Sequence, residues 1–238
     1  MSNRSWLRPS GLVLTGLGAL FLAISSFVIV RELRGPAEVS ADPPGSRWAD
    51  RPDGWRELLL DAEDEAPRFD GTLNGIRIAP TLPRGGASCG PGDRAGYVDR
   101  DAVRGEAVEI APSYLPAGTV AGAETVLACP NGTVLEHVIE YEVPTDYTLE
   151  RFGGGMAIVR GVTGEPRFAL DASAERARTA EIAGRPAVVF RPLSEDGFGP
   201  SAVIVAEPWG VTAVQAYGLT EDEVVRIAEG LYGSGVAR

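Results

Sequence analysis

The sequence contains no lysine, and all 22 basic residues among its 238 are arginines. It has a single histidine and two cysteines, Cys89 and Cys129. Two cysteines that do not form a C-x-x-C motif are too few for a thiolate metal site. A phosphate loop needs a Gly-Lys-Ser/Thr ending. The three glycines at 153–155 therefore predict a turn or bulge that leads into a strand, not a nucleotide site.

Positive charge is scarce beyond the N-terminus. The net charge of the whole chain is −11. Residues 1–34 hold four arginines and one glutamate, which leaves 18 arginines against 32 acidic residues, or −14, for residues 35–238. An acidic domain of this kind repels phosphate and does not release counterions from it, so nucleic-acid binding is excluded.

Charged side chains are also missing from residues 11–30, GLVLTGLGALFLAISSFVIV. A helix of that length covers about 30 Å, the thickness of the hydrocarbon core of a bilayer. We therefore expect a single transmembrane helix over 11–30, preceded by a cytoplasmic stub at 1–10. Arg4 and Arg8 favour an N-terminus on the inside, although two arginines also follow the span.

A cleaved signal peptide is the alternative, because Val39-Ser40-Ala41 resembles a small-residue cleavage site. The apolar run is longer than the roughly 7–15 residues of a signal peptide. We therefore favour an uncleaved signal-anchor in the cell membrane. Residues 31–54 are rich in proline and glycine and predict a tether. Residues 55–238 are then an extracytoplasmic domain.

Two stretches of the domain predict helices. Residues 55–65 predict a short helix with Leu58, Leu59 and Leu60 against the body of the domain. Near the C-terminus, Thr220 and Glu223 form a capping-box pattern. The helix that follows carries an apolar stripe at i, i+3, i+4 and i+7, and Gly233 closes it. The stripe consists of Val224, Ile227, Ala228 and Leu231.

Between these helices the chain consists of short β-prone runs separated by turn residues. Asn-Gly between apolar runs is a strong hairpin signal, because both residues tolerate positive φ. Residues 72–80 predict one strand. Hairpins are predicted over 124–143, 179–192 and 201–217, with the first turning at Asn131-Gly132. The domain is therefore predicted to be α+β, with a mostly antiparallel sheet and a C-terminal helix packed on it.

Alternation along residues 133–143 divides that strand into two faces. Leu135, His137, Ile139, Tyr141 and Val143 share one face, which we expect in the core. On that face, His137 is expected to be a hydrogen-bonded structural residue, not a ligand or a general base. The opposite face carries Glu136, Glu140 and Glu142 together with two valines. We expect this acidic face to be solvated, and it is the candidate interaction surface.

The two cysteines predict a disulfide if the domain lies outside the cytoplasm. In the loop-entropy model, a bridge between Cys89 and Cys129 would stabilise the fold by roughly 4 kcal/mol. Two unpaired buried thiols are the alternative.

The sequence resembles a known family in its C-terminal half. The run from Gly184-Arg185-Pro186-Ala187 through 201–217 to GLTEDEVVRIAEGL at 218–231 resembles the end of a bacterial extracytoplasmic domain of unknown function. That domain is often found beyond the membrane helix of anti-sigma-factor-like proteins. The segment PSYLPAG at 112–118 is similar to its P-x-Y-L-P-x-G entry. The resemblance covers residues 112–231 loosely and implies a curved antiparallel sheet, with no catalytic residues to carry over.

These features predict a membrane-anchored binding or sensing domain without catalytic activity. Its partners are expected to be the membrane, through residues 11–30, and an envelope protein, a peptide or a lipid-like ligand. No catalytic residue, cofactor or metal ion is expected, because no nucleophile–base pair or carboxylate pair stands out. The acidic cluster Glu63-Asp64-Glu65 lacks a calcium-loop pattern.

An accessory single-span subunit of a membrane complex is the alternative function. Small side chains in the span would then allow close packing against partner helices. They are Gly11, Gly16, Gly18, Ala19 and Ala23. A hydrolase is a third class, and it would be limited to Asp and Glu chemistry.

Overall fold

The computed structural model describes residues 45–82, 89, 95–99, 111–144 and 155–233. The predicted stub, the predicted span and residues 31–44 of the predicted tether lie outside these ranges. Among the described residues, no helix has the length and apolar character needed to cross a membrane.

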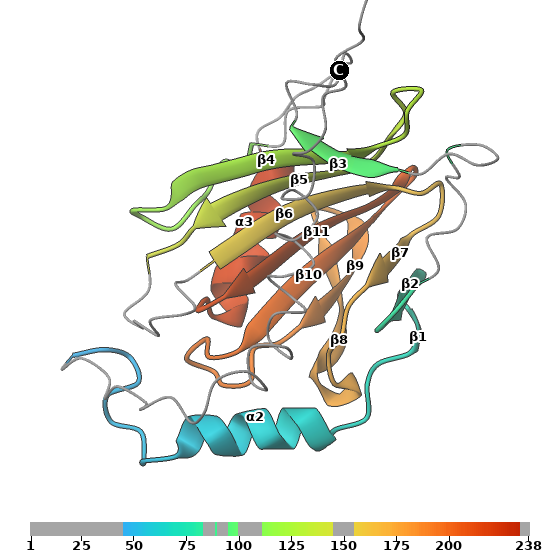
Figure 1. Ribbon diagram of the computed structural model, residues 1–238. Helices are drawn as coiled ribbons and strands as arrows, with labels where there is room; N and C mark the ends of the chain where they lie inside the picture. Colours follow the sequence, from blue (N-terminus) through green and yellow to red (C-terminus); the bar gives the residue numbers. More distant parts are fainter. Residues whose placement is uncertain (1–44, 83–88, 90–94, 100–110, 145–154, 234–238) are drawn as a thin grey trace, which may run out of the picture. The chain divides into compact units, whose positions relative to one another are not determined.

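The described chain contains two α-helices, one 3-10 helix and eleven strands (Figure 1). In chain order they are α2 (Trp55–Glu65), β1 (Gly71–Leu73), β2 (Ile76–Ala79), β3 (Gly96–Asp99), β4 (Val120–Ala128), β5 (Val134–Glu142), β6 (Gly155–Val162), β7 (Arg167–Ala169), η2 (Ala174–Arg176), β8 (Ala177–Ile182), β9 (Arg185–Phe190), β10 (Pro200–Glu207), β11 (Gly210–Tyr217) and α3 (Glu221–Gly233).

Eight of these strands form one antiparallel sheet in the order β3-β4-β5-β6-β11-β10-β9-β8. The hairpins β4–β5, β8–β9 and β10–β11 are the three that the turn residues predicted. Gly132 and Gly184 take positive φ angles of 86° and 77° in the turns of the first two. The ladder between β4 and β5 shifts register twice, and such bulges increase the local bend and twist of a sheet.

Helix α3 covers one face of this sheet over β8, β10 and β11, behind the strands in Figure 1. The predicted stripe is confirmed, because Val224, Ile227 and Ala228 are buried in the core and Leu231 packs against it. The capping box is confirmed as well. The backbone N–H of Thr220 donates to Glu223 Oε2 at 2.7 Å, and the backbone N–H of Glu223 donates to Thr220 Oγ1 at 3.3 Å.

A strap at residues 112–118 lies along α3. The backbone N–H of Ser113 donates to the carbonyl oxygen of Gly230 at 2.9 Å, and its hydroxyl donates to the same oxygen at 3.0 Å. The guanidinium carbon of Arg226 lies 4.0 Å from the ring centroid of Tyr114. A Cβ at position 230 would come within 3.0 Å of the Tyr114 backbone nitrogen, so glycine permits this close approach.

The other face of the large sheet carries a second sheet, β1-β2-β7, in which β2 and β7 are parallel. The prediction of one strand over 72–80 is wrong, because Asn74 and Gly75 turn the chain into a hairpin. The Asn74 side-chain amide donates to the carbonyl oxygens of Ala180 and Ala187 at 2.8 and 3.0 Å. These bonds fasten the hairpin tip to β8 and β9.

Helix α2 spans the predicted residues 55–65. Leu59 and Leu60 pack on an aromatic cluster, whereas Leu58 is 71% exposed. The prediction that all three leucines face the body is therefore wrong for Leu58. Three consecutive residues on a helix point about 100° apart and cannot share one face. The overall fold is nevertheless the predicted one, an α+β domain with a mostly antiparallel, curved sheet and a C-terminal helix.

Candidate functional site

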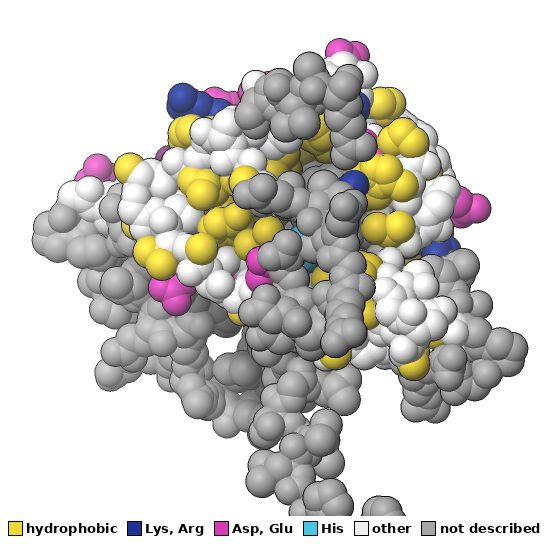
Figure 2. Space-filling model, turned by 90° about the horizontal axis from the view of Figure 1, so that it is seen from above, with side chains coloured by type: hydrophobic (Ala, Val, Ile, Leu, Met, Phe, Trp, Pro, Cys, Tyr) yellow, Lys and Arg dark blue, Asp and Glu magenta, His cyan; other side chains and the backbone are white. Residues whose placement is uncertain are grey.

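The predicted acidic face lies on β5, opposite the face that α3 covers. Val138 lies between Glu136 and Glu140 on this face and is fully buried, whereas Glu142 is exposed. Glu136 is half-buried and accepts a hydrogen bond from the Tyr97 hydroxyl at 2.9 Å. The expected solvated face is therefore found only in part, because Val138 at its centre is buried. Figure 2 shows acidic side chains scattered singly over the described surface seen from above, not gathered in one patch. The role of this face in binding stays a prediction.

The single histidine lies on the other face of β5, as predicted. His137 is 4% exposed, and its Nε2 atom lies 2.6 Å from the carboxylate Oε1 of Glu124 on β4. The expectation of a buried, hydrogen-bonded histidine is confirmed. Further along the same face, burial raises the pKa of Tyr141, and the negative charge of Glu124 raises it further.

Polar side chains continue from His137 across the neighbouring strands. The register places Arg160 of β6 opposite His137, and Thr212 of β11 opposite Arg160. The guanidinium carbon of Arg160 lies 3.9 Å from the ring centroid of Trp209, within the range of a cation–π contact. Thr212 is buried. Three adjacent strands therefore place polar side chains in one line on the α3 face.

The line ends in a cluster beneath the last turn of α3. The Tyr232 hydroxyl donates to Glu207 Oε1 at 2.7 Å, and Glu207 Oε2 lies 3.5 Å from Arg185 Nε. The Arg185 guanidinium carbon lies 4.3 Å from the Tyr232 ring centroid. Burial raises the pKa of Tyr232, and the hydrogen bond to Glu207 and the charge of Glu207 raise it further. Tyr232 therefore stays a neutral hydrogen-bond donor at physiological pH.

We name these residues together the polar row. Its members are Glu124, His137, Arg160, Thr212, Glu207, Tyr232 and Arg185. In the sequence, only His137 was singled out by its position on a core face. Arg160 shares one face of β6 with the buried Met156 and Ile158, because residues two apart on a strand point to the same side. Glu207 likewise shares one face of β10 with the buried Val203 and Val205. A polar residue at the alternate position of an otherwise apolar strand face was thus the sequence feature that could have predicted the row.

The two cysteines form the predicted disulfide, and their Cα atoms lie 5.1 Å apart. Cys129 directly follows β4, and Cys89 lies 40 residues earlier in the chain. The alternative of two unpaired thiols is therefore excluded. The bridge holds Cys89 at the end of β4, beside the β4–β5 turn.

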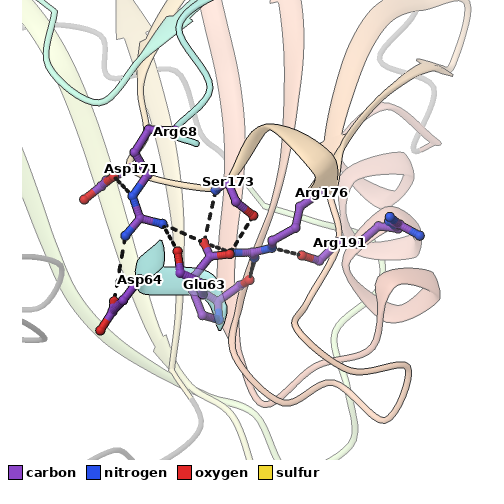
Figure 3. A network of polar contacts seen from close by, with 8 residues as sticks. Glu63, Asp64, Arg68, Asp171, Ser173, Arg176 and Arg191 are labelled. Carbon is purple, nitrogen blue, oxygen red and sulfur yellow. Dashed lines mark hydrogen bonds and ion pairs between the residues drawn. The ribbon is translucent and has the colours of Figure 1, made fainter. Parts of the chain in front are cut away.

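A second polar cluster joins α2 to the large sheet (Figure 3). The Glu63 carboxylate accepts hydrogen bonds from the Ser173 backbone N–H at 3.1 Å, the Ser173 hydroxyl at 2.6 Å and Arg176 Nη1 at 2.7 Å. Arg176 also donates from Nε to the Arg191 carbonyl oxygen at 2.7 Å and from Nη2 to the Pro200 carbonyl oxygen. Burial lowers the pKa of Arg176, and Glu63 opposes that shift.

Arg68 extends this cluster towards solvent. It lies 3.1 Å from Asp171 and 3.8 Å from Asp64, and its Nη1 donates to the Glu63 carbonyl oxygen at 2.7 Å. Each charged group of the cluster thus has a partner of opposite charge, and every guanidinium nitrogen of Arg176 has an acceptor. We assign the cluster to docking of α2 onto the sheet, not to ligand binding.

In the part of the chain that the structure describes, no group of three or more His, Cys, Asp or Glu side chains could hold a metal ion. Glu221 of the acidic cluster at the start of α3 pairs with Arg178, and Glu223 caps the helix.

No protein-family model matches the chain, and neither a curated protein nor a solved structure matches it.

Proposed function

We propose that the chain is a membrane-anchored extracytoplasmic binding domain that acts in sensing and not in catalysis. The observation that carries this proposal is the Cys89–Cys129 disulfide. Disulfides persist in oxidising compartments and are rare in the cytosol. The disulfide favours a domain outside the cytoplasm, and the apolar run at 11–30 provides the span that would hold it there. The resemblance to a bacterial extracytoplasmic domain stays a prediction.

The binding site that we propose for this domain is the part of the polar row around Arg160, which is half-buried, because His137, Thr212 and Glu207 are buried. Burying polar groups costs stability unless they are hydrogen-bonded, and His137 and Tyr232 have hydrogen-bond partners within the row. The row places a guanidinium, an imidazole and hydroxyl groups side by side. The planar guanidinium of Arg160, held against Trp209, suits the carboxylate of a peptide or the headgroup phosphate of a lipid-like ligand.

The location is tested by adding protease to bacterial spheroplasts that express the full chain. We expect loss of the domain in intact spheroplasts and protection of the domain in inside-out vesicles. Thiol labelling in the same cells should require prior reduction. Protection in spheroplasts, or thiols that are labelled without reductant, would place the domain in the cytoplasm.

Binding is tested by thermal unfolding of the full chain in detergent, with a panel of short extended peptides and of anionic phospholipids. A ligand present at 100 times its Kd stabilises the folded chain by about 2.7 kcal/mol. We expect this stabilisation in the wild type and in the control Arg178→Gln, but not in Arg160→Gln. Equal stabilisation in all three would place the site elsewhere. A wild type that responds to no panel member would overturn the binding role.

A further inference from the structure

The stretch of residues 45–54, which directly precedes α2, packs on the domain although it contains no helix or strand. In residues 45–54, the backbone N–H groups of Ala49 and Arg51 donate to carbonyl oxygens at positions 46 and 48, each at 3.1 Å. Trp48 is 1% exposed, and its ring meets that of Phe198 edge to face at 6.4 Å. A single tryptophan thus anchors a chain of turns to the folded domain.

The surface that receives Trp48 is the loop between β9 and β10. Phe198 is 1% exposed and also packs edge to face against Trp55 of α2 at 4.8 Å and Tyr217 of β11 at 6.1 Å. Gly197 has a φ of 91°, and a Cβ there would lie 2.6 Å from the Leu219 backbone. This conformation and this close approach both require glycine, so the loop is fixed against the body of the domain.

Two arginines of the stretch reach the same loop and the start of α3. Arg47 Nη1 donates to the Asp196 carbonyl oxygen at 3.1 Å and lies 3.5 Å from Glu223 Oε2. Arg51 pairs with the Asp196 carboxylate. Because Glu223 also caps α3, the stretch contacts the first turn of the C-terminal helix directly.

These contacts with the domain are made by side chains, whereas the backbone hydrogen bonds of residues 45–54 to described residues are local. The Arg47 and Arg51 side chains are 35% and 41% exposed, and exposed ion pairs of this kind are weak and screened by salt. The ion pairs therefore hold the stretch only weakly, and burial of the Trp48 ring supplies most of the free energy that an opening must overcome. Detachment of the stretch would break no hydrogen bond of the sheet, so it would be a local opening.

We propose that residues 45–54 form a releasable clasp that sets how far the domain stands from the membrane. This inference rests on the proposed membrane anchor. With the clasp closed, the tether ends where Arg47 and Trp48 bind. With the clasp open, ten further residues join the tether and add up to about 35 Å of reach. A signal that displaces the clasp would thus move the polar row away from the bilayer.

The first test is tryptic cleavage of the full chain in lipid nanodiscs. Trypsin cuts after arginine, so the Arg47–Trp48 bond reports the open state. Glu223→Gln with Asp196→Asn removes both ion-pair partners, and glutamine still completes a capping box. We expect cleavage at this bond to accelerate about tenfold, because cleavage follows the open population. The control Glu221→Gln changes the same helical turn and should cleave like the wild type.

The second test measures reach in vesicles that contain an acceptor dye on the lipid headgroups. A donor dye is attached to Glu181→Cys, an exposed position on β8. We expect energy transfer to fall in the Glu223→Gln/Asp196→Asn variant and to stay unchanged in Glu221→Gln. If the chain associates with vesicles but the Glu223→Gln/Asp196→Asn variant is cleaved like the wild type, the clasp is overturned and the membrane anchor is not. The same holds if this variant is cleaved faster but its energy transfer is unchanged. Failure of the wild-type chain to associate with vesicles would overturn the membrane anchor, and the clasp with it.

Discussion

At the scale of single residues, the described domain uses buried charge in two ways. Arg176 and Glu63 are both largely buried, and the ion pair is completed by backbone groups of Ser173, Arg191 and Pro200. Such a pair is weak evidence for stability, because desolvation offsets much of the attraction. Removing one member, however, leaves the other charged and unpaired in the interior.

We therefore expect Glu63→Ala to destabilise the domain by about 3–5 kcal/mol, because Arg176 loses its counter-ion. The neighbouring Asp64→Ala is the matched control. Asp64 is exposed and lies 3.8 Å from Arg68, so its removal should change stability by less than about 1 kcal/mol. Thermal unfolding of the three chains in detergent measures both values. Equal losses in the two variants would contradict the assigned role of Glu63.

The pKa of Glu223 makes a residue-scale prediction about pH. Burial opposes ionisation, but the hydrogen bonds from Thr220 and the positive charge of Arg47 outweigh it, and the pKa falls below 4.5. Because the folded-state pKa is lowered, the ionised carboxylate stabilises the fold at neutral pH. This contribution disappears as the pH falls from about 4.5 through the lowered folded-state value. The wild type should thus exceed Glu223→Gln in thermal midpoint at pH 7, and the difference should shrink as the pH falls below about 4.5. A constant difference would contradict the assignment.

At the scale of elements, the strap at 112–118 lies close to α3. Its distance from each of two glycines of the helix determines how replacement of that glycine by alanine changes stability. Glycine within a helix normally costs about 1 kcal/mol relative to alanine. At Gly230 an added Cβ would meet backbone nitrogen at 3.0 Å, in a strap that is hydrogen-bonded to the same residue. At Gly233 the nearest atom is the Ser113 hydroxyl oxygen at 3.8 Å, an ordinary contact.

We expect Gly230→Ala to destabilise the domain by about 1 kcal/mol, since displacement of the strap exceeds the gain in helix propensity. The matched Gly233→Ala should be neutral or slightly stabilising. Thermal midpoints of both variants give the comparison. Stabilisation by Gly230→Ala would show that the strap yields without cost.

The elements that could be predicted from the sequence are those with local signals. The Asn131-Gly132 turn and the Thr220–Glu223 capping box depend on residues within a few positions, and both formed as expected. The Asn74-Gly75 hairpin carried the same turn signal but was missed, because the runs that flank it are only three and four residues long.

The candidate site was less accessible to sequence reasoning. The polar row depends on which strands are neighbours, and β6 pairs with β11 across about fifty residues of chain. The partners of Glu63 lie 110 and 113 residues away. Alternation along β5 correctly separated His137 from the glutamates. It could not show that other parts of the chain would bury Val138 among them.

At the scale of the whole molecule, the disulfide links Cys89 to Cys129, directly after β4. The sequence separation of 40 residues implies a stabilisation of roughly 4 kcal/mol in the loop-entropy model. For a domain of this size, a loss of 1 kcal/mol lowers the thermal midpoint by about 2–4 °C. The double variant Cys89→Ser/Cys129→Ser should therefore have a thermal midpoint lower by about 8–16 °C. Reduction of the wild type should give the same shift, and the double variant should be insensitive to reductant. An unchanged midpoint after verified reduction would mean that the packed sheet already restrains this loop. The bridge would then mark the compartment of the domain without supporting its fold.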